Sequence, residues 1–313
     1  MKAALIRAVG ALPEPGDADA PDGDDVVEVL AASINPIDLA DSRGILATGH
    51  PDLPYVPGCE VVGRTSDGRI VWVFGGGFGR TRNGGIGERA VIGDALAIDV
   101  PDGADPAVAA GLGIAGLAGW LPFAWRAPLE GGENVLVLGA TGSVGLVAVQ
   151  TAKLLGAARV VAAGRSPEGL ERATALGADA VLRLDGTDDL AAAFKDAFGG
   201  DGPSYVFDAL WGEPAAAAAQ AASPWARFVN LGQSAGSTAE LASGAVRGKN
   251  LTILGHFAFG VPHEVFAEHY PRLVRHAVVG EIRLDVERVQ LEDVAHAWRR
   301  QAAGEGAKLV LVP

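Results

Sequence analysis

Cysteine is almost absent from this sequence: its 313 residues include a single one, Cys59. One cysteine cannot form an intrachain disulfide, and it cannot supply a structural zinc site that needs several thiolates. This favours a reducing compartment. Because residues 1–12 also lack the charged and then apolar layout of a signal peptide, we expect a cytoplasmic protein.

Positive charge is also scarce. Lys and Arg number 25 against 38 Asp and Glu, which gives a formal net charge of -13. Such a chain repels phosphate backbones and anionic membrane surfaces, and no uninterrupted apolar run reaches the roughly 20 residues of a membrane helix. We therefore expect neither a nucleic-acid partner nor a membrane partner. Much of the acid falls in residues 14–25, where Pro and Gly break any periodicity and predict a solvated loop.

The chain is long enough and apolar enough for two folded domains. Hydrophobic residues make up 49% of it, and single cores stop growing near 250 to 300 residues. Residues 1–115 contain short strand-like segments between Gly and Pro turns, which predict a small β-rich barrel or sandwich. Residues 116–260 alternate apolar strands with Ala-rich helices, and residues 261–313 are expected to return to the first domain.

The second domain has the pattern of a parallel sheet with helices between its strands. Six strands are predicted, at residues 134–139, 159–163, 179–184, 204–210, 227–232 and 251–255. One of the intervening helices, at residues 190–198, is expected to be capped by Thr187 or Asp188. The fold class is thus α/β, a doubly wound parallel sheet of the Rossmann type.

The strongest motif follows the first of these strands and reads Gly139-Ala140-Thr141-Gly142-Ser143-Val144-Gly145. Small residues at 140, 142 and 145 give the A-x-G-x-x-G variant of the nucleotide fingerprint. Gly142 allows the backbone to approach a pyrophosphate, and Gly145 permits tight packing of helix on strand. The free N–H groups at the start of the next helix would bind the phosphates. The competing interpretation is a purely structural glycine-rich turn.

Two further segments are predicted to contact the cofactor. The tip of the second strand reads Gly164-Arg165-Ser166, with no carboxylate before Glu168 to take a ribose 2′-hydroxyl. Arg165 and Ser166 suit a 2′-phosphate, so NADP(H) is favoured over NADH unless Arg165 is an ordinary surface side chain. Leu231-Gly232-Gln233-Ser234 follows the carboxyl end of a later strand, where doubly wound sheets place ligands. His256 lies after the last strand, and an aromatic residue there is more often core.

Four segments in order resemble one family across nearly the whole chain. They are residues 33–38 (Ser-Ile-Asn-Pro-Ile-Asp), residues 53–58 (Leu-Pro-Tyr-Val-Pro-Gly), the fingerprint, and residues 229–236. Together they resemble the zinc-independent quinone oxidoreductase branch of the medium-chain dehydrogenase/reductase superfamily. The resemblance implies a GroES-like domain formed by both chain ends and an inserted Rossmann domain, with nicotinamide and substrate meeting in a cleft between them. It also implies that Asn35 lies close to the nicotinamide and Tyr55 near the cleft mouth.

A zinc-dependent alcohol dehydrogenase is the first alternative, and the zinc-dependent relatives show what it would need. They carry Cys and Asp where this chain has Asn35 and Asp38, and a His where Cys59 precedes Glu60. Catalytic zinc needs three good protein ligands, and this chain offers no convincing third one. Without that Lewis acid, the expected reaction is transfer of hydride from NADPH to a quinone or another activated C=C or C=O acceptor. Asn35 and Tyr55 are the expected catalytic residues.

The chain also departs from the family, which leaves a second alternative open. Ala40, Leu46, Ala118 and Leu184 stand where relatives often carry Tyr or Thr. These changes predict an apolar pocket for a small apolar acceptor, or a cofactor-binding protein that has lost redox activity. The apolar strand at 251–255 is expected to be an open sheet edge, which predicts a homodimer.

Overall fold

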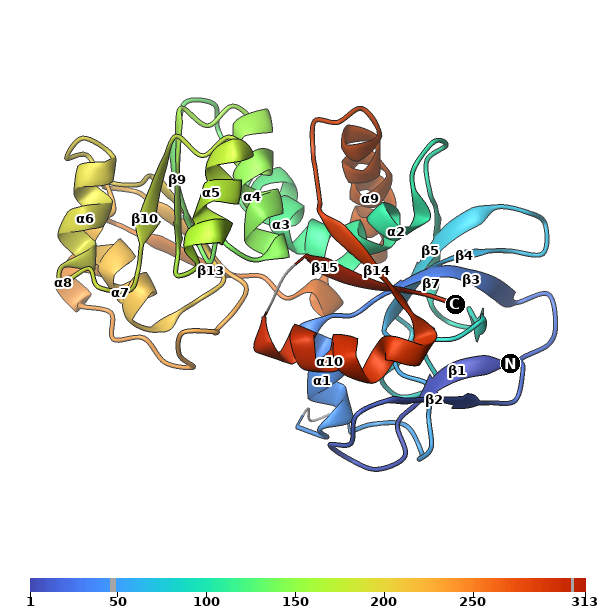
Figure 1. The fold of residues 1–313 in the computed structure, drawn as a ribbon. Coiled ribbons are helices and arrows are strands. Elements are labelled where there is room, and N and C mark those ends of the chain that lie inside the picture. The colour runs from blue at the N-terminus through green and yellow to red at the C-terminus, as the bar shows by residue number, and fades with distance from the viewer. Residues whose placement is uncertain (46–48, 305–306) are drawn as a thin grey trace. The chain divides into compact units, whose positions relative to one another are not determined.

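The computed structural model describes residues 1–45, 49–304 and 307–313. The chain divides into two compact units, drawn in Figure 1. Unit 1 consists of residues 1–115, 262–280 and 284–313, and unit 2 consists of residues 116–261 and 281–283. Each unit has its own hydrophobic core.

Unit 2 is built on a six-stranded parallel sheet with the order β10-β9-β8-β11-β12-β13. Its strands are β8 (Asn134–Leu138), β9 (Arg159–Gly164), β10 (Ala180–Arg183), β11 (Tyr205–Asp208), β12 (Arg227–Asn230) and β13 (Thr252–Gly255). All six predicted strands and the doubly wound fold class are confirmed. The strand order reverses between β8 and β11, which is where such sheets bind ligands.

Alternating side chains of the central strand hold helices on both faces of this sheet. Val135 and Val137 pack with the first pair of helices, while Leu136 and Leu138 pack with the second pair. The helices are α4 (Ser143–Leu154) and α5 (Pro167–Ala175) in the first pair, and α6 (Leu190–Ala197) and α7 (Gly212–Ala221) in the second. Figure 1 shows the two pairs on opposite sides of the strands, and the short α8 (Ser243–Gly248) near α7.

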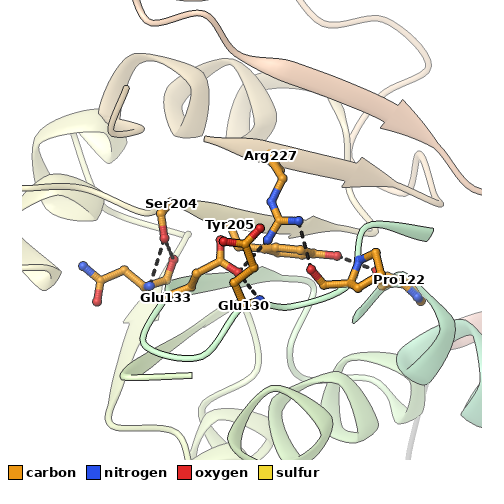
Figure 2. Close-up of polar contacts among 8 residues, drawn as sticks. Pro122, Glu130, Glu133, Ser204, Tyr205 and Arg227 are labelled. Carbon is orange, nitrogen blue, oxygen red and sulfur yellow. Dashed lines mark hydrogen bonds and ion pairs between the residues drawn. The ribbon is translucent and has the colours of Figure 1, made fainter. Parts of the chain in front are cut away.

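The amino ends of the central strands are tied together by one arginine, as Figure 2 shows. Arg227 donates to the carboxylate of Glu133 at 2.6 Å and to the carbonyl of Pro128 at 2.9 Å. Its guanidinium carbon lies 5.3 Å from the centroid of the Tyr205 ring. The Tyr205 hydroxyl donates to the carbonyl of Pro122 at 2.7 Å. The polar groups at this edge therefore satisfy one another.

One helical stretch corrects an expectation from the sequence. Residues 106–126 run as α2 (Pro106–Gly111), a π-helical turn (Leu112–Gly116), α3 (Leu117–Leu121) and a second π-helical turn (Pro122–Arg126). By length and by a mean hydropathy of 1.6, this stretch passes as a membrane span, although the sequence showed no such run. Because 78% of its most apolar window is buried inside the protein, it behaves as a core helix.

Unit 1 contains a seven-stranded mixed sheet in which the order is β14-β15-β3-β4-β5-β7 and β6 pairs with β3. The strands are β3 (Val26–Ser33), β4 (Glu60–Arg64), β5 (Ile70–Phe74), β6 (Arg89–Val91), β7 (Leu96–Asp99), β14 (Val286–Gln290) and β15 (Lys308–Val312). The last strand, β15, pairs antiparallel with β3. The predicted return of the chain's end to the first domain is thus confirmed.

Helices α1 (Pro36–Ser42), α9 (His263–Val278) and α10 (Val294–Ala303) complete unit 1, together with a two-stranded sheet. That sheet pairs β1 (Lys2–Leu5) with β2 (Glu14–Asp17), so the predicted loop at residues 14–25 begins with a strand. In unit 2, the side chain of Asp189 caps α6, and the predicted cap at Thr187 or Asp188 is wrong. Both errors concern short polar segments. The strand at residues 14–17 has a partner that is distant in the sequence, and the observed cap lies one residue after the predicted pair.

Candidate functional site

The fingerprint turn between β8 and α4 has the backbone that a pyrophosphate site needs. Gly139 has a φ of 86°, a conformation that favours glycine, and a Cβ at Gly145 would overlap the Gly139 carbonyl oxygen. A Cβ at Gly142, in contrast, would meet no protein atom within 4 Å. Gly139 and Gly145 are therefore required by the fold, whereas Gly142 leaves space open at the start of α4.

The start of α4 differs from the starts of α5 and α6, which are capped by side chains. The N-cap residue of α4 is Gly142, and no side chain in the described chain caps the helix. In α5, the Ser166 hydroxyl accepts the Gly169 N–H at 3.1 Å, and in α6, Asp189 accepts the Ala192 N–H at 2.9 Å. The uncapped N–H groups of α4 are thus available to an anionic ligand.

The predicted 2′-phosphate residues lie at the end of β9. Gly164 is packed against Thr141 of the fingerprint, since a Cβ there would overlap the threonine methyl. Arg165 is exposed. Ser166 is already committed, because its hydroxyl caps α5 and also donates to the Glu168 carboxylate at 3.0 Å. Of these three residues, Arg165 is the one whose polar side chain is exposed and available to a ligand.

The segment after β12 reaches the turn after β11. A Cβ at Gly232 would overlap the Ala209 carbonyl, and the Ser234 hydroxyl donates to that carbonyl at 3.2 Å. Leu231 is half-buried, and Gln233 is exposed. The carboxyl ends of β9, β8, β11 and β12 therefore form one contiguous edge, which carries every predicted cofactor residue: Gly139, Ala140, Thr141, Gly142, Ser143, Val144, Gly145, Gly164, Arg165, Ser166, Leu231, Gly232, Gln233 and Ser234.

His256, which the sequence favoured as core, is an unexpected feature of the same edge. It follows β13, is 8% exposed, and has two buried ring nitrogens with no hydrogen-bond partner in the described chain. The ring of Trp125 lies edge-on at 6.3 Å. Burial, followed by the charge of Arg126, lowers the pKa of His256 to about 4, so its imidazole is neutral near pH 7. A buried imidazole with an unused donor and an unused acceptor is costly unless a ligand completes it.

In unit 1, Asn35 forms part of a buried polar network. Its side-chain N–H groups donate to Glu60 at 2.8 Å and Ser33 at 3.2 Å, and its side-chain oxygen accepts from Lys308 at 2.6 Å. Its backbone N–H donates to Asp38 at 2.7 Å, at the start of α1. Asn35 is 1% exposed. A substrate oxygen bound by this amide would have to displace one of these contacts.

The second carboxylate oxygen of Glu60 explains the irregular helix after α2. It accepts the Trp72 indole N–H at 2.8 Å and the Ile114 backbone N–H at 2.7 Å. A Cβ at Gly113 would overlap this oxygen, and Gly113 has a non-helical ψ of -108°. The carboxylate thus enters the helix and takes an amide that a regular turn would use internally.

At the positions where zinc-dependent relatives bind metal, the carboxylates already accept hydrogen bonds from the protein. Both carboxylate oxygens of Glu60 are taken by protein donors, and Asp38 accepts from the Asn35 and Cys59 backbones. The Cys59 thiol is fully buried, and burial raises its pKa well above the usual value. Among the residues described, no three His, Cys, Asp or Glu side chains gather in a metal-binding arrangement.

Tyr55 is the one predicted catalytic residue with an uncommitted polar group. It is 2% exposed, and its hydroxyl is buried without a hydrogen-bond partner in the part of the chain that the structure covers. Burial raises the pKa of Tyr55 to about 12, with smaller contributions from Asp41 and Asp38, so the hydroxyl keeps its proton. The His50 ring stacks on the Tyr55 ring at 6.3 Å. This hydroxyl can donate a hydrogen bond to a bound oxygen.

The positions that depart from the family contribute little polarity. Ala40, Ala118 and Leu184 are all partly buried and carry no polar side-chain atom. Leu46 lies outside the described residues. The apolar character predicted for these positions therefore rests on residue type, and the donors identified in the structure are Tyr55 and His256.

Comparison with known proteins agrees with this geometry. Residues 143–275 match the family model described as zinc-binding dehydrogenase. Over 307 residues, the chain is 27% identical to a phenolphthiocerol/phthiocerol polyketide synthase protein of Mycobacterium tuberculosis; the match covers 93% of this chain and 14% of that much longer protein. Identities of 30% relate it to the human quinone oxidoreductase (48% of this chain, 46% of that protein) and to the chloroplastic NADPH-dependent alkenal/one oxidoreductase of Arabidopsis thaliana (59% and 49%).

Solved structures match the fold over the whole chain. The structure of AibC aligns with a TM-score of 0.89 at 25% identity and covers 100% of this chain and 96% of that one. Mycobacterial Rv1454c, solved in complex with NADPH, aligns with a TM-score of 0.83 at 23% identity and covers both chains fully. The chain has the fold of the medium-chain dehydrogenase/reductase superfamily, and its match to the zinc-binding dehydrogenase model covers less than half of its length. Its relatives include both quinone oxidoreductases and a zinc-type alcohol dehydrogenase-like protein of Schizosaccharomyces pombe, whose match covers 63% of this chain at 32% identity.

Proposed function

We propose that this protein is an NADPH-dependent oxidoreductase that transfers hydride, without zinc, to a quinone or another activated C=C or C=O acceptor. The observation that carries the proposal is the open Gly142 turn before the uncapped α4, at the point where the sheet order reverses. A pyrophosphate there would receive the free N–H groups of α4 and meet no side chain.

The preference for NADPH rests on the end of β9. Arg165 is exposed there, whereas Ser166 and Glu168 are bonded to each other. The guanidinium suits a 2′-phosphate, and the nearest carboxylate is already engaged. NADPH in the name of one relative and in the complex of another supports the same assignment.

The acceptor reaction rests on buried donors that have no partner. When hydride adds to an enone or quinone, an electron pair moves onto the acceptor oxygen, and fixed donors stabilise that charge. In unit 2 the neutral His256 imidazole is such a donor, and in unit 1 the Tyr55 hydroxyl is another; we propose each of them as a candidate for this task. A place for Asn35 near the nicotinamide stays a prediction from the family resemblance; because its side chain is already hydrogen-bonded, we propose that it positions a bound group and does not protonate it.

The donor set supports the proposal that the reaction does not use zinc. Both carboxylate oxygens of Glu60 accept hydrogen bonds from the protein, those of Asp38 accept backbone N–H groups, and the Cys59 thiol is buried. A cofactor-binding protein without redox activity is the second candidate, favoured by Ala118 and Ala40 at positions where relatives often carry polar groups.

We further propose that the protein is cytoplasmic and forms a homodimer. The dimer is proposed because β13 is the last strand of its sheet and Ile253 is 36% exposed on it.

The experiment that tests the proposal is NADPH consumption by purified protein with quinones, α,β-unsaturated ketones, aldehydes and enoyl thioesters, each with and without a chelator. We expect turnover with at least one activated acceptor that chelation leaves unchanged. Tight NADPH binding without turnover on any acceptor would favour the second candidate. Light scattering at micromolar concentration tests the dimer, and a monomeric mass would contradict it.

A further inference from the structure

Trp211 occupies a backbone conformation that is otherwise reserved for glycine. It follows β11, serves as the N-cap residue of α7, and has φ 56° and ψ -156°. In this region the Cβ of an ordinary residue collides with its own backbone, so side chains of any size are rare. A tryptophan here is strained, and such strain persists only where the surroundings impose it.

Hydrogen bonds around Trp211 hold its backbone in this strained conformation. Asp208, at the end of β11, accepts the Leu210 N–H at 2.9 Å and the Trp211 N–H at 2.8 Å, while Asn230 holds its other oxygen at 2.9 Å. The Leu210 carbonyl accepts the Ala235 N–H at 2.8 Å. The turn is thus fixed by β12 and the loop after it, independently of the indole ring. A glycine at 211 could make the same backbone bonds without strain.

The location of Trp211 indicates what the strain is kept for. The fingerprint glycine Gly139 packs against Leu210, so Trp211 is one residue from the wall of the fingerprint turn. Arg165 lies after β9, on one side of β8, whereas Trp211 lies after β11, on the other. If the 2′-phosphate end of the dinucleotide points toward β9, its nicotinamide half extends across β11 and β12.

A second tryptophan supplies the contrast. Trp225 also has a positive φ, of 65°, but it precedes β12 and so lies at the amino edge of the same sheet. The residue is 72% exposed, and its backbone N–H donates to the Lys249 carbonyl at 2.6 Å. Trp211 is instead half-buried, at the edge that carries the cofactor residues.

We propose that Trp211 is a positioning residue for the cofactor, with its indole packed against the nicotinamide half of the bound dinucleotide. The proposal rests on the function proposed above, since it takes the dinucleotide to lie at this edge. An indole face gives a large apolar contact with few rotatable bonds, which suits the task of holding a planar nicotinamide at one orientation. The strain is then the condition for placing a ring where the fold would accept a glycine.

The test compares Trp211→Gly with Trp225→Gly and with the conservative Trp211→Phe. We expect Trp211→Gly to weaken NADPH binding about tenfold, which is ~1.4 kcal/mol, and to melt no lower than wild type because strain is released. Trp225→Gly should bind NADPH as wild type does. Trp211→Phe should keep the affinity within about threefold, since it retains a ring at the contact.

A second readout follows the indole directly. Binding of NADPH should quench tryptophan emission in wild type and in Trp225→Phe, and the quenching should be clearly smaller in Trp211→Phe. Wild-type affinity and quenching in the Trp211 variants would overturn this inference and leave the proposed function intact. Failure of wild-type protein to bind either NADPH or NADH would overturn both.

Discussion

The two edges of the parallel sheet in unit 2 differ in whether they leave polar groups without a protein partner. At the amino edge, the Arg227 guanidinium, the Glu133 carboxylate and the Tyr205 hydroxyl all bind other protein groups (Figure 2). At the carboxyl edge, the start of α4 has no side-chain cap, and the His256 imidazole has no partner among the described residues. Both edges belong to the same strands, which pack against the same two hydrophobic cores. The unpaired groups at the carboxyl edge therefore do not reflect a poorly packed part of the sheet.

The contrast indicates that the groups able to bind a ligand lie at the carboxyl edge. Paired groups at the amino edge stabilise the sheet and leave nothing for a ligand, whereas unpaired groups at the carboxyl edge lower stability until a ligand arrives. The account therefore predicts that changes at the amino edge alter stability alone. Changes at the carboxyl edge should alter binding or turnover, with stability unchanged or improved.

The largest expected effect concerns His256. Its pKa is lowered from 6.5 to about 4 in the folded protein, so the unfolded chain binds the extra proton first as pH falls. The contribution to stability is complete above about pH 6.5 and is lost as pH falls to about 4, a change of about 3 kcal/mol. We expect His256→Phe to flatten this dependence in denaturant titrations at pH 4 to 7 and to lower turnover. An unchanged slope with unchanged turnover would remove His256 from the carboxyl-edge site.

Gly142→Asp should separate binding from stability most cleanly. Gly142 has φ -93° and ψ 168°, which any residue adopts, and aspartate is a preferred N-cap residue. We expect the unfolding free energy to rise by up to about 1 kcal/mol, because α4 gains a cap. NADPH affinity should fall at least 100-fold, ~2.7 kcal/mol, because the carboxylate takes the place of the pyrophosphate.

The control for this variant is Gly142→Ala, which adds neither a cap nor a charge. It should retain more affinity than Gly142→Asp, as measured by isothermal titration. Should Gly142→Asp bind NADPH as tightly as wild type does, the cofactor would have to lie elsewhere.

At the amino edge, Arg227→Met should do the reverse. Methionine keeps apolar contact with the Tyr205 ring but removes the hydrogen bonds to the Glu133 carboxylate and the Pro128 carbonyl. The Glu133 carboxylate is largely buried and would lose its positively charged partner. We expect a loss of about 2 kcal/mol in the free energy of unfolding, from chemical denaturation. The dissociation constant for NADPH should not change. A large change in NADPH affinity without a loss of stability would break the distinction between the edges.

The smallest expected effect is at Arg165, an exposed side chain at the far end of the carboxyl edge. We expect wild-type protein to prefer NADPH over NADH by at least tenfold, ~1.4 kcal/mol, and Arg165→Ala to lose that preference. Fluorescence titration with both cofactors measures it. Arg172→Ala, in the helix that follows β9, serves as a charge-matched control. Equal wild-type affinities for the two cofactors would contradict the assignment.

Most of unit 2 could be predicted from the sequence because its strands are continuous apolar runs and its fingerprint has fixed spacing. The strand at Glu14–Asp17 could not, since a segment with Pro and Gly forms a strand only because Lys2–Leu5 lies beside it. The strain at Trp211 and the unpartnered ring nitrogens of His256 could not be predicted for a related reason. Backbone strain and the absence of a hydrogen-bond partner among the residues described are properties of three-dimensional surroundings, and neither leaves a pattern in residue type.

The long apolar stretch at residues 106–126 is hard to predict because glycines and prolines interrupt it in the sequence. In the structure, those same residues accommodate its π-helical turns, and Glu60 binds one of the amides that is freed. Asn35 illustrates the converse limit. The sequence predicted its place in the site, but only the structure shows that its amide N–H groups are already bonded.

The central claim is metal-free transfer of hydride from a cofactor held at the carboxyl edge. It is tested most directly by incubating chelator-treated protein with NADPH deuterated at C4 of the nicotinamide, in the transferable position, and an α,β-unsaturated ketone that the acceptor panel has identified, in which the transferred deuterium stays on carbon. The account predicts that the reduced acceptor carries one deuterium from the cofactor, at a rate equal to that of untreated protein and much reduced in Gly142→Asp. Transfer that disappears on chelation and returns with Zn²⁺ would contradict it.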